Sequence, residues 1–233
     1  MLVHAHGFAV ARGVAEHVDV ELDVRGGLPA FSVIGLGGGA ARDARERVHA
    51  AVLNSGFAFP RKRMTANLAP GASARSAPSF DLVLACCVLA AQGELDAARL
   101  ARIGLFAQLG LGGDLRTCDG VAAAALAAEQ ARLAGLIVAR GDLREARAAG
   151  ALPIAGLSSL RVVAALLAAG GRDGTAAPVR RPPTRLPGAP SHAAAATREG
   201  GPAPARATPA PAGRAVRARA NGRPPPGSTA RGP

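Results

Sequence analysis

A glycine cluster between a β-prone stretch and an amphipathic stretch has the spacing of a phosphate-binding loop. Gly35-Leu36-Gly37-Gly38-Gly39-Ala40 fits the pattern G-x-G-x-x-A, in which backbone N–H groups at a helix start hold a pyrophosphate. Such a site also needs an acidic residue about 20 positions on, at the end of the next strand. The next expected strand, Met64 to Leu68, is followed by Ala-Pro and has no carboxylate. We therefore favour a structural turn that lets strand and helix pack closely. The candidate nucleotide-binding residues are Gly35, Gly37, Gly38 and Gly39.

Two basic groups could contact a partner or nucleic acid. The helical stretch after the glycines carries Arg42, Arg45 and Arg47, and Arg61-Lys62-Arg63 precedes the next strand. In one interpretation the helix arginines contact a partner or a neighbouring subunit. In the other they form a solvated face that adjacent acidic residues partly neutralise, and both interpretations stay open. For the triplet, a solvated strand start that protects a sheet edge is favoured over a phosphate contact.

The histidines and cysteines do not predict a metal centre. His4 and His6 share a strand face and His17 lies on the next strand, but no carboxylate or cysteine is fixed by spacing to complete a ligand set. The three cysteines stand among apolar neighbours, so we expect buried, reduced thiols and a cytoplasmic protein. No metal site is predicted.

The elements that position these residues are strands and helices without strict alternation. Apolar and acidic residues alternate from His17 to Val24, which predicts a strand that forms a hairpin with Leu2 to Val10 through Arg12-Gly13. The whole order predicts an α+β or irregular α/β fold. Further strands are expected at Phe31 to Ile34, Met64 to Leu68, Leu136 to Ala139 and Leu152 to Ala155, a second hairpin from Ile103 to Gly110 and Asp114 to Thr117, and helices at Ala40 to Asn54, Phe80 to Ala91, Val121 to Leu133 with Asp119 as its cap, Asp142 to Ala149 and Ser159 to Leu167.

Several runs closely resemble the N-terminal domain of the magnesium-chelatase-like AAA+ ATPase family, of the YifB or competence protein ComM type. They lie in order between about Leu2 and Ala169: GLPAFSVIGL, ARDARERVHAAVLNSGFAFPRKRMTANLAPG, SFDLVLA, GLFAQLGLGGDLRTCDGVAAAALAA, GLIVAR and LSSLRVVAALL. The resemblance implies a Lon-protease-like fold, shared with a small-ribosomal-subunit domain, over residues 1–171. The chain departs from the family at Leu36 to Gly39, where a Leu-Pro-Asp-type turn is usual. The fingerprint-like glycines are therefore expected to be incidental.

The resemblance also implies ATP-driven rings that use ATP and Mg²⁺ and, in the competence proteins, remodel DNA. This sequence has no G-x-x-x-x-G-K-[ST] motif, and Lys62, its only lysine, follows no glycine loop. The serine and lysine of Lon-type proteolysis are missing too, because Pro78 stands at or beside the serine position and Ala122 at the lysine position. Ser79 is thereby left without a base to activate it. We predict no catalytic residue and no cofactor for this chain.

Residues 172–233 differ from the rest in composition. They hold 11 of the 28 basic residues, opposed only by Asp173 and Glu199, and 13 of the 18 prolines. Such a segment cannot bury enough apolar surface to offset its ordering entropy, so a disordered tail is expected. Its Arg, Pro, Ala and Gly content is also what out-of-frame translation of a G+C-rich gene yields. A frameshifted tail and a genuine basic tail are both hypotheses.

Together these observations predict a non-catalytic accessory or oligomerisation domain of that ATPase family. Its partner would be another copy of itself or an ATPase. No apolar run is long enough to span a bilayer, and the first residues do not have the pattern of a signal peptide. One alternative is a nucleic-acid-binding protein that acts non-specifically through the arginine tail. The other is a small nucleotide-binding enzyme that uses the Gly35 to Ala40 loop.

Overall fold

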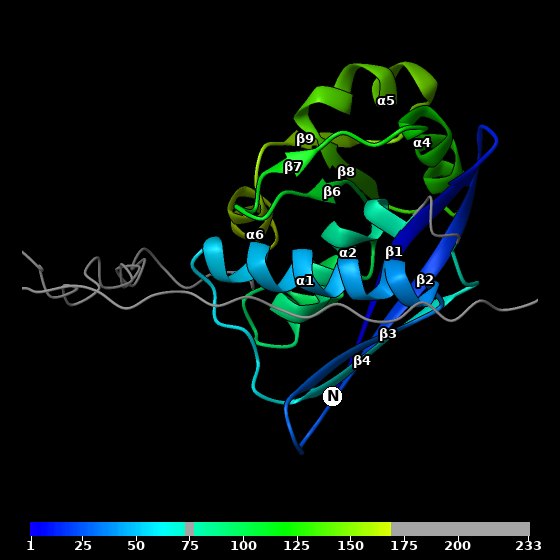
Figure 1. The fold of residues 1–233 in the computed structure, drawn as a ribbon. Helices are drawn as coiled ribbons and strands as arrows, with labels where there is room; N and C mark the ends of the chain where they lie inside the picture. Colours follow the sequence, from blue (N-terminus) through cyan, green and yellow to red (C-terminus); the bar gives the residue numbers. More distant parts are fainter. Residues whose placement is uncertain (73–76, 169–233) are drawn as a thin grey trace, which may run out of the picture. The chain divides into compact units, whose positions relative to one another are not determined.

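The computed structural model describes residues 1–72 and 77–168, which fold around a mixed seven-stranded sheet in the order β3-β4-β2-β1-β5-β8-β9 (Figure 1). β2 pairs antiparallel with both β1 and β4, and the other neighbours in this sheet are parallel. The mixed α/β class is therefore as the sequence predicts. The strands are β1 (Leu2–Ala11), β2 (Val14–Arg25), β3 (Ala30–Ile34), β4 (Arg63–Ala69), β5 (Ile103–Phe106), β8 (Gly135–Ala139) and β9 (Ile154–Leu157).

The two faces of this sheet pack against different helices. Successive residues of a strand point to opposite faces, and in β5 Leu105 belongs to one hydrophobic cluster while Phe106 belongs to the other. The first cluster includes α1, α2 and α6, and the second includes α4 and α5. The helices are α1 (Gly38–Asn54), α2 (Asp81–Ala90), α3 (Ala97–Leu100), α4 (Val121–Gln130), α5 (Leu143–Ala149) and α6 (Leu160–Leu167), with short 3₁₀ turns at Ala77–Phe80 and Arg140–Asp142.

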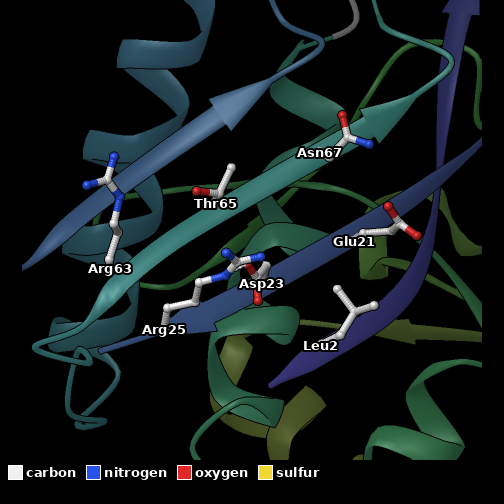
Figure 2. Close-up of a pocket in the computed structure, with 7 residues that line it drawn as sticks. All are labelled: Leu2, Glu21, Asp23, Arg25, Arg63, Thr65 and Asn67. Atoms are coloured by element: carbon white, nitrogen blue, oxygen red, sulfur yellow. Dashed lines mark hydrogen bonds and ion pairs between the residues drawn. The ribbon is translucent and has the colours of Figure 1, made fainter. Parts of the chain in front are cut away.

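On the face of α4 and α5, the part of the sheet formed by β2 and β4 is polar and accessible. A shallow cavity of about 340 Å³ lies there, and Figure 2 shows the side chains that line it. In β2 the alternation of acidic residues with Val18, Val20, Leu22 and Val24 puts the valines and leucine into the first core and the carboxylates on this face. The lining residues are Leu2, Glu21, Asp23, Arg25, Arg63, Thr65 and Asn67.

The centre of the first core is α2, whose ten residues are all buried. A helix that is apolar on nearly every side belongs in an interior. All three cysteines are free thiols: Cys86 and Cys87 are buried in α2, and Cys118 is half-buried. Burial raises the pKa of Cys87 and of Cys118 to about 12. None of the described helices has the length and apolar character needed to cross a membrane.

Two expected elements differ in the structure. Ile103 to Gly110 was expected to form one arm of a hairpin, but β5 joins the main sheet between β1 and β8. Only β6 (Gln108–Leu109) pairs with β7 (Leu115–Arg116). The reason is burial, because β5 supplies a side chain to each core. Asp119 is not the cap of α4: Gly120, with φ of 84°, takes that position without a side-chain bond. The expected domain boundary at residue 171 and the expected disorder of residues 172–233 lie outside the described residues.

Candidate functional site

The glycine loop lies between β3 and α1, and its first glycine has a structural role. Gly35 has φ of +93°, a left-handed conformation that favours glycine. A Cβ atom at this position would lie 2.6 Å from the carbonyl oxygen of Leu68 in β4. The Gly35 carbonyl also accepts a 2.8 Å hydrogen bond from the Ala72 N–H. Gly35 therefore lets the turn pack directly against the backbone of β4.

The other three glycines are exposed and have room for side chains. Gly37 is the N-cap of α1 with φ of −57°, and its carbonyl accepts the Ala41 N–H at 2.8 Å. Gly38 and Gly39 are the first residues of the helix, and a Cβ added to any of the three would meet nothing within 4 Å. β4, the next strand, ends at Ala69 without a carboxylate. What the structure supports at this loop is the packing role of Gly35.

The three predicted arginines of α1 have different surroundings. Arg42 is exposed and lies 3.7 Å from Asp43. Arg45 donates a 3.2 Å hydrogen bond to the carbonyl of Phe31 in β3. Arg47 points inward, and its Nε and Nη2 donate to the two carboxylate oxygens of Asp81 at 2.7 and 3.0 Å. The guanidinium of Arg47 is thus engaged within the domain, whereas Arg42 and Arg45 remain the candidates for external contacts.

Asp81, the first residue of α2, is completely buried and was not singled out from the sequence. Besides Arg47, its carboxylate accepts a 3.3 Å hydrogen bond from the Leu109 N–H. Burial raises the pKa of this carboxyl to about 6, against the lowering effect of the Arg47 guanidinium. Asp81 therefore joins α1, α2 and β6 through one charged group. Its identity as a buried acid could not be read from sequence, because its partner is 34 positions away.

Ser79 also has a structural partner. Its side chain is almost fully buried, and its Oγ donates a 3.0 Å hydrogen bond to the carbonyl of Phe8 in β1. A serine nucleophile needs a neighbouring base to remove its proton. Lys62, the only lysine of the sequence, is an exposed residue before β4 and belongs to a different surface. The Ser79 hydroxyl is thus engaged with the backbone of β1.

Arg45, Arg61 and Lys62, which are separate in the sequence, lie around one aromatic surface. Two adjoining hollows of about 590 and 290 Å³ share the side chains of three residues as lining. Arg61 and Lys62 line the larger hollow, and Arg45 lines the smaller one together with Glu46. We call this surface the basic-aromatic groove. Its defining residues are Phe31, Arg45, His49, Phe59, Arg61 and Lys62.

Ring contacts fix the floor of this groove. The Phe59 ring packs edge-on against His49 at a centroid distance of 4.5 Å and against Phe31 at 5.8 Å. None of these three rings was singled out from the sequence, since they come from β3, α1 and the loop before β4. Arg63 points away from the groove and lines the cavity on the open sheet face (Figure 2). The basic triplet is therefore divided between two surfaces.

The geometry defines a mixed α/β domain with a packed glycine turn, a buried Arg47–Asp81 pair and an exposed basic-aromatic groove. Residues 20–142, more than half of the chain, match the family described as subunit ChlI of Mg-chelatase. The chain belongs to this family. The glycine turn, the Arg47–Asp81 pair and the residues that define the basic-aromatic groove all lie within the matched region.

Relatives of known sequence are longer than this chain. Competence protein ComM of Haemophilus influenzae is 38% identical over 129 residues, which cover 55% of this chain and 25% of that protein. An uncharacterized protein of Mycobacterium tuberculosis is 35% identical over 155 residues, or 66% of this chain and 31% of its own length. The uncharacterized protein YifB of Escherichia coli is 36% identical over 111 residues, covering 48% of this chain and 22% of YifB. The matched region thus spans between about a fifth and a third of these relatives.

Proposed function

We propose that this chain is a non-catalytic accessory domain of the ChlI, ComM and YifB family, which acts in the cytoplasm by binding another copy of itself or an ATPase partner. The observation that carries the proposal is that the groups with catalytic potential already have structural partners. Gly35 packs against Leu68, Ser79 bonds to the Phe8 carbonyl and the Asp81 carboxylate pairs with Arg47. A role in competence, as in the name of the Haemophilus relative, is part of this proposal.

An ATP hydrolysis assay on the purified 233-residue chain tests the proposal. We expect no phosphate release above the rate of a Lys62→Ala variant, because the single lysine lies outside any phosphate-binding loop. For each of the two proteins, the melting temperature should be the same with and without ATP and Mg²⁺. Hydrolysis by the wild type that Lys62→Ala abolishes would refute the non-catalytic assignment.

A second candidate function, binding of single-stranded nucleic acid, is favoured by the basic-aromatic groove. Proteins of this kind combine cations that follow the phosphate backbone with aromatic rings on which bases stack. Here Arg61 and Lys62 stand beside Phe59, and Arg45 lies on the other side of the same rings. This proposal locates binding in the folded domain rather than in the arginine tail.

Fluorescence anisotropy with a labelled single-stranded oligonucleotide separates these two locations. Lys62→Ala should weaken binding several-fold and reduce the slope of log affinity against log salt by about 1, as removal of one phosphate contact does. Arg63→Ala is the matched control, because it removes the same charge from the neighbouring position on the other surface. Equal effects of the two variants, or complete loss of binding in a chain ending at residue 171, would contradict the groove and favour the tail.

A further inference from the structure

Two histidines and one aspartate of the β1–β2 hairpin bring three ligand atoms together. His6 Nδ1 lies 3.1 Å from Asp19 Oδ1 and 3.0 Å from His17 Nε2, and His17 Nε2 lies 3.7 Å from the same Asp19 oxygen. The register of the hairpin places Asp19 directly opposite His6, and His17 lies two positions before Asp19 on the same face. Within residues 1–72 and 77–168, no other trio of His, Cys, Asp or Glu side chains is grouped in this way.

The hydrogen bond on the far side of His6 determines which ring nitrogen carries its proton. His6 Nε2 lies 3.0 Å from the carbonyl oxygen of Ala101, which can only accept, so Nε2 must carry hydrogen. In the neutral ring the Nδ1 atom then carries a lone pair, which faces the Asp19 carboxylate. Two acceptors at this distance repel unless a positive charge lies between them. The Nδ1 lone pair of His6 thus converges with His17 Nε2 and the Asp19 carboxylate oxygen, as ligand atoms do around a metal ion.

We propose that His6 Nδ1, His17 Nε2 and Asp19 Oδ1 form a binding site for a divalent transition metal, with Zn²⁺ as the best match. Tetrahedral Zn²⁺ with bonds of about 2.0 to 2.1 Å separates neighbouring ligand atoms by about 3.3 Å. The three observed distances, 3.0, 3.1 and 3.7 Å, lie on either side of that value. Two imidazoles and one carboxylate are a ligand set that zinc sites use.

The surroundings of the trio also resemble those of a metal site. A histidine ligand commonly donates its second ring N–H to a backbone carbonyl, which fixes the tautomer and the ring orientation, and Ala101 accepts that bond from His6. The His17 ring packs against the buried Phe8 ring at 5.8 Å.

Solvent can still reach the site from the side of Asp19. The side chains of His6 and His17 are 19% and 30% exposed, whereas that of Asp19 is 62% exposed. Three protein ligands on an accessible surface leave a fourth position for water or for a ligand from a partner. His4, on the same face, lies 3.6 Å from Glu21 and does not belong to the trio. His4→Ala is therefore a matched control for weak metal binding by a surface histidine outside the site.

Zinc titration of the untagged, chelator-treated full chain tests the site. We expect one Zn²⁺ bound per chain by calorimetry, and visible absorption bands of four- or five-coordinate Co²⁺ when cobalt replaces zinc. His17→Ala and Asp19→Asn should each raise the dissociation constant by more than about tenfold, because even outer partners of metal ligands contribute that much. His4→Ala should bind as the wild type does.

The Asp19→Asn variant distinguishes loss of a metal ligand from a change in folding. Asp19→Asn keeps the size of an exposed side chain, so its circular dichroism and melting temperature without metal should match the wild type. Absence of zinc binding by the wild type would overturn the proposal. So would unchanged binding in both ligand variants, or a loss in His4→Ala as large as that in His17→Ala.

Discussion

Replacing Arg47 with methionine should lower the free energy of unfolding by about 3 kcal/mol or more at neutral pH. The substitution leaves the Asp81 carboxyl, which is 0% exposed, with the Leu109 N–H as its remaining hydrogen-bond donor among the described residues. A buried charge whose partner is removed must either stay unpaired or take up a proton, and both are unfavourable. Urea unfolding followed by circular dichroism measures the effect.

Arg42→Met is the matched control for this change. Arg42 lies on the same helix, but its side chain is 71% exposed and its nearest acidic partner, Asp43, is 60% exposed. Exposed pairs of this kind contribute little, so we expect a change within about 0.5 kcal/mol. In a double variant, Arg47→Met with Asp81→Leu, most of the lost stability should return, because no buried charge remains. A small effect of Arg47→Met alone would show that the pair is not important for stability.

The same pair predicts a pH dependence with a definite sign. The pKa of Asp81 is about 6 in the folded state, whereas an unfolded aspartate titrates near 4. Between about pH 4 and pH 6 the folded chain therefore binds more protons, so the contribution of Asp81 to stability falls as the pH rises through this window. The stability of the wild type relative to Asp81→Asn should decrease from pH 4 to 6 and then level off. A difference that rises over this range would contradict the burial argument.

Local pattern was sufficient for much of the fold. The strict alternation of β2 identified its core face, and the expected hairpin forms through a two-residue turn at Arg12-Gly13. The helix expected from Ala40 to Asn54 forms as α1, with Ala41, Ala44, Val48, Ala51 and Val52 buried. By contrast, Ile103 to Phe106 is apolar throughout, so its sequence could not indicate whether it pairs with a nearby hairpin partner or with β1 and β8. That choice is made by tertiary packing.

The sites needed contacts between distant elements, which spacing along the chain does not provide. Arg47 and Asp81 meet because α1 crosses α2, and the rings of the groove come from three different elements. One signal was available, however. A two-residue turn at Arg12-Gly13 fixes the hairpin register and puts Asp19 opposite His6. The carboxylate missing from the histidine set could thus have been found by extending the predicted hairpin residue by residue.

Replacing Gly35 with alanine should destabilise the domain by about 3 kcal/mol, the sum of a strained left-handed residue and an overpacked contact. The new Cβ atom would lie 2.6 Å from the Leu68 carbonyl oxygen and 2.9 Å from the Leu68 Cβ atom. Leu68 cannot move away easily, because it is buried and pairs with Val20 in the β2–β4 ladder. Urea unfolding of the variant measures this loss.

Gly39→Ala is the control that separates packing from ligand binding at this loop. Gly39 is helical and has open space around it, so alanine should leave the stability unchanged or increase it by up to about 1 kcal/mol. In a dinucleotide-binding loop, the second glycine of the pattern allows the backbone to approach the pyrophosphate, and here that residue is Gly37. If the loop serves only packing, Gly37→Ala should melt like the wild type, and neither protein should respond to NAD or ATP. A nucleotide-dependent rise in the melting temperature of the wild type that Gly37→Ala abolishes would instead assign a binding function to the loop.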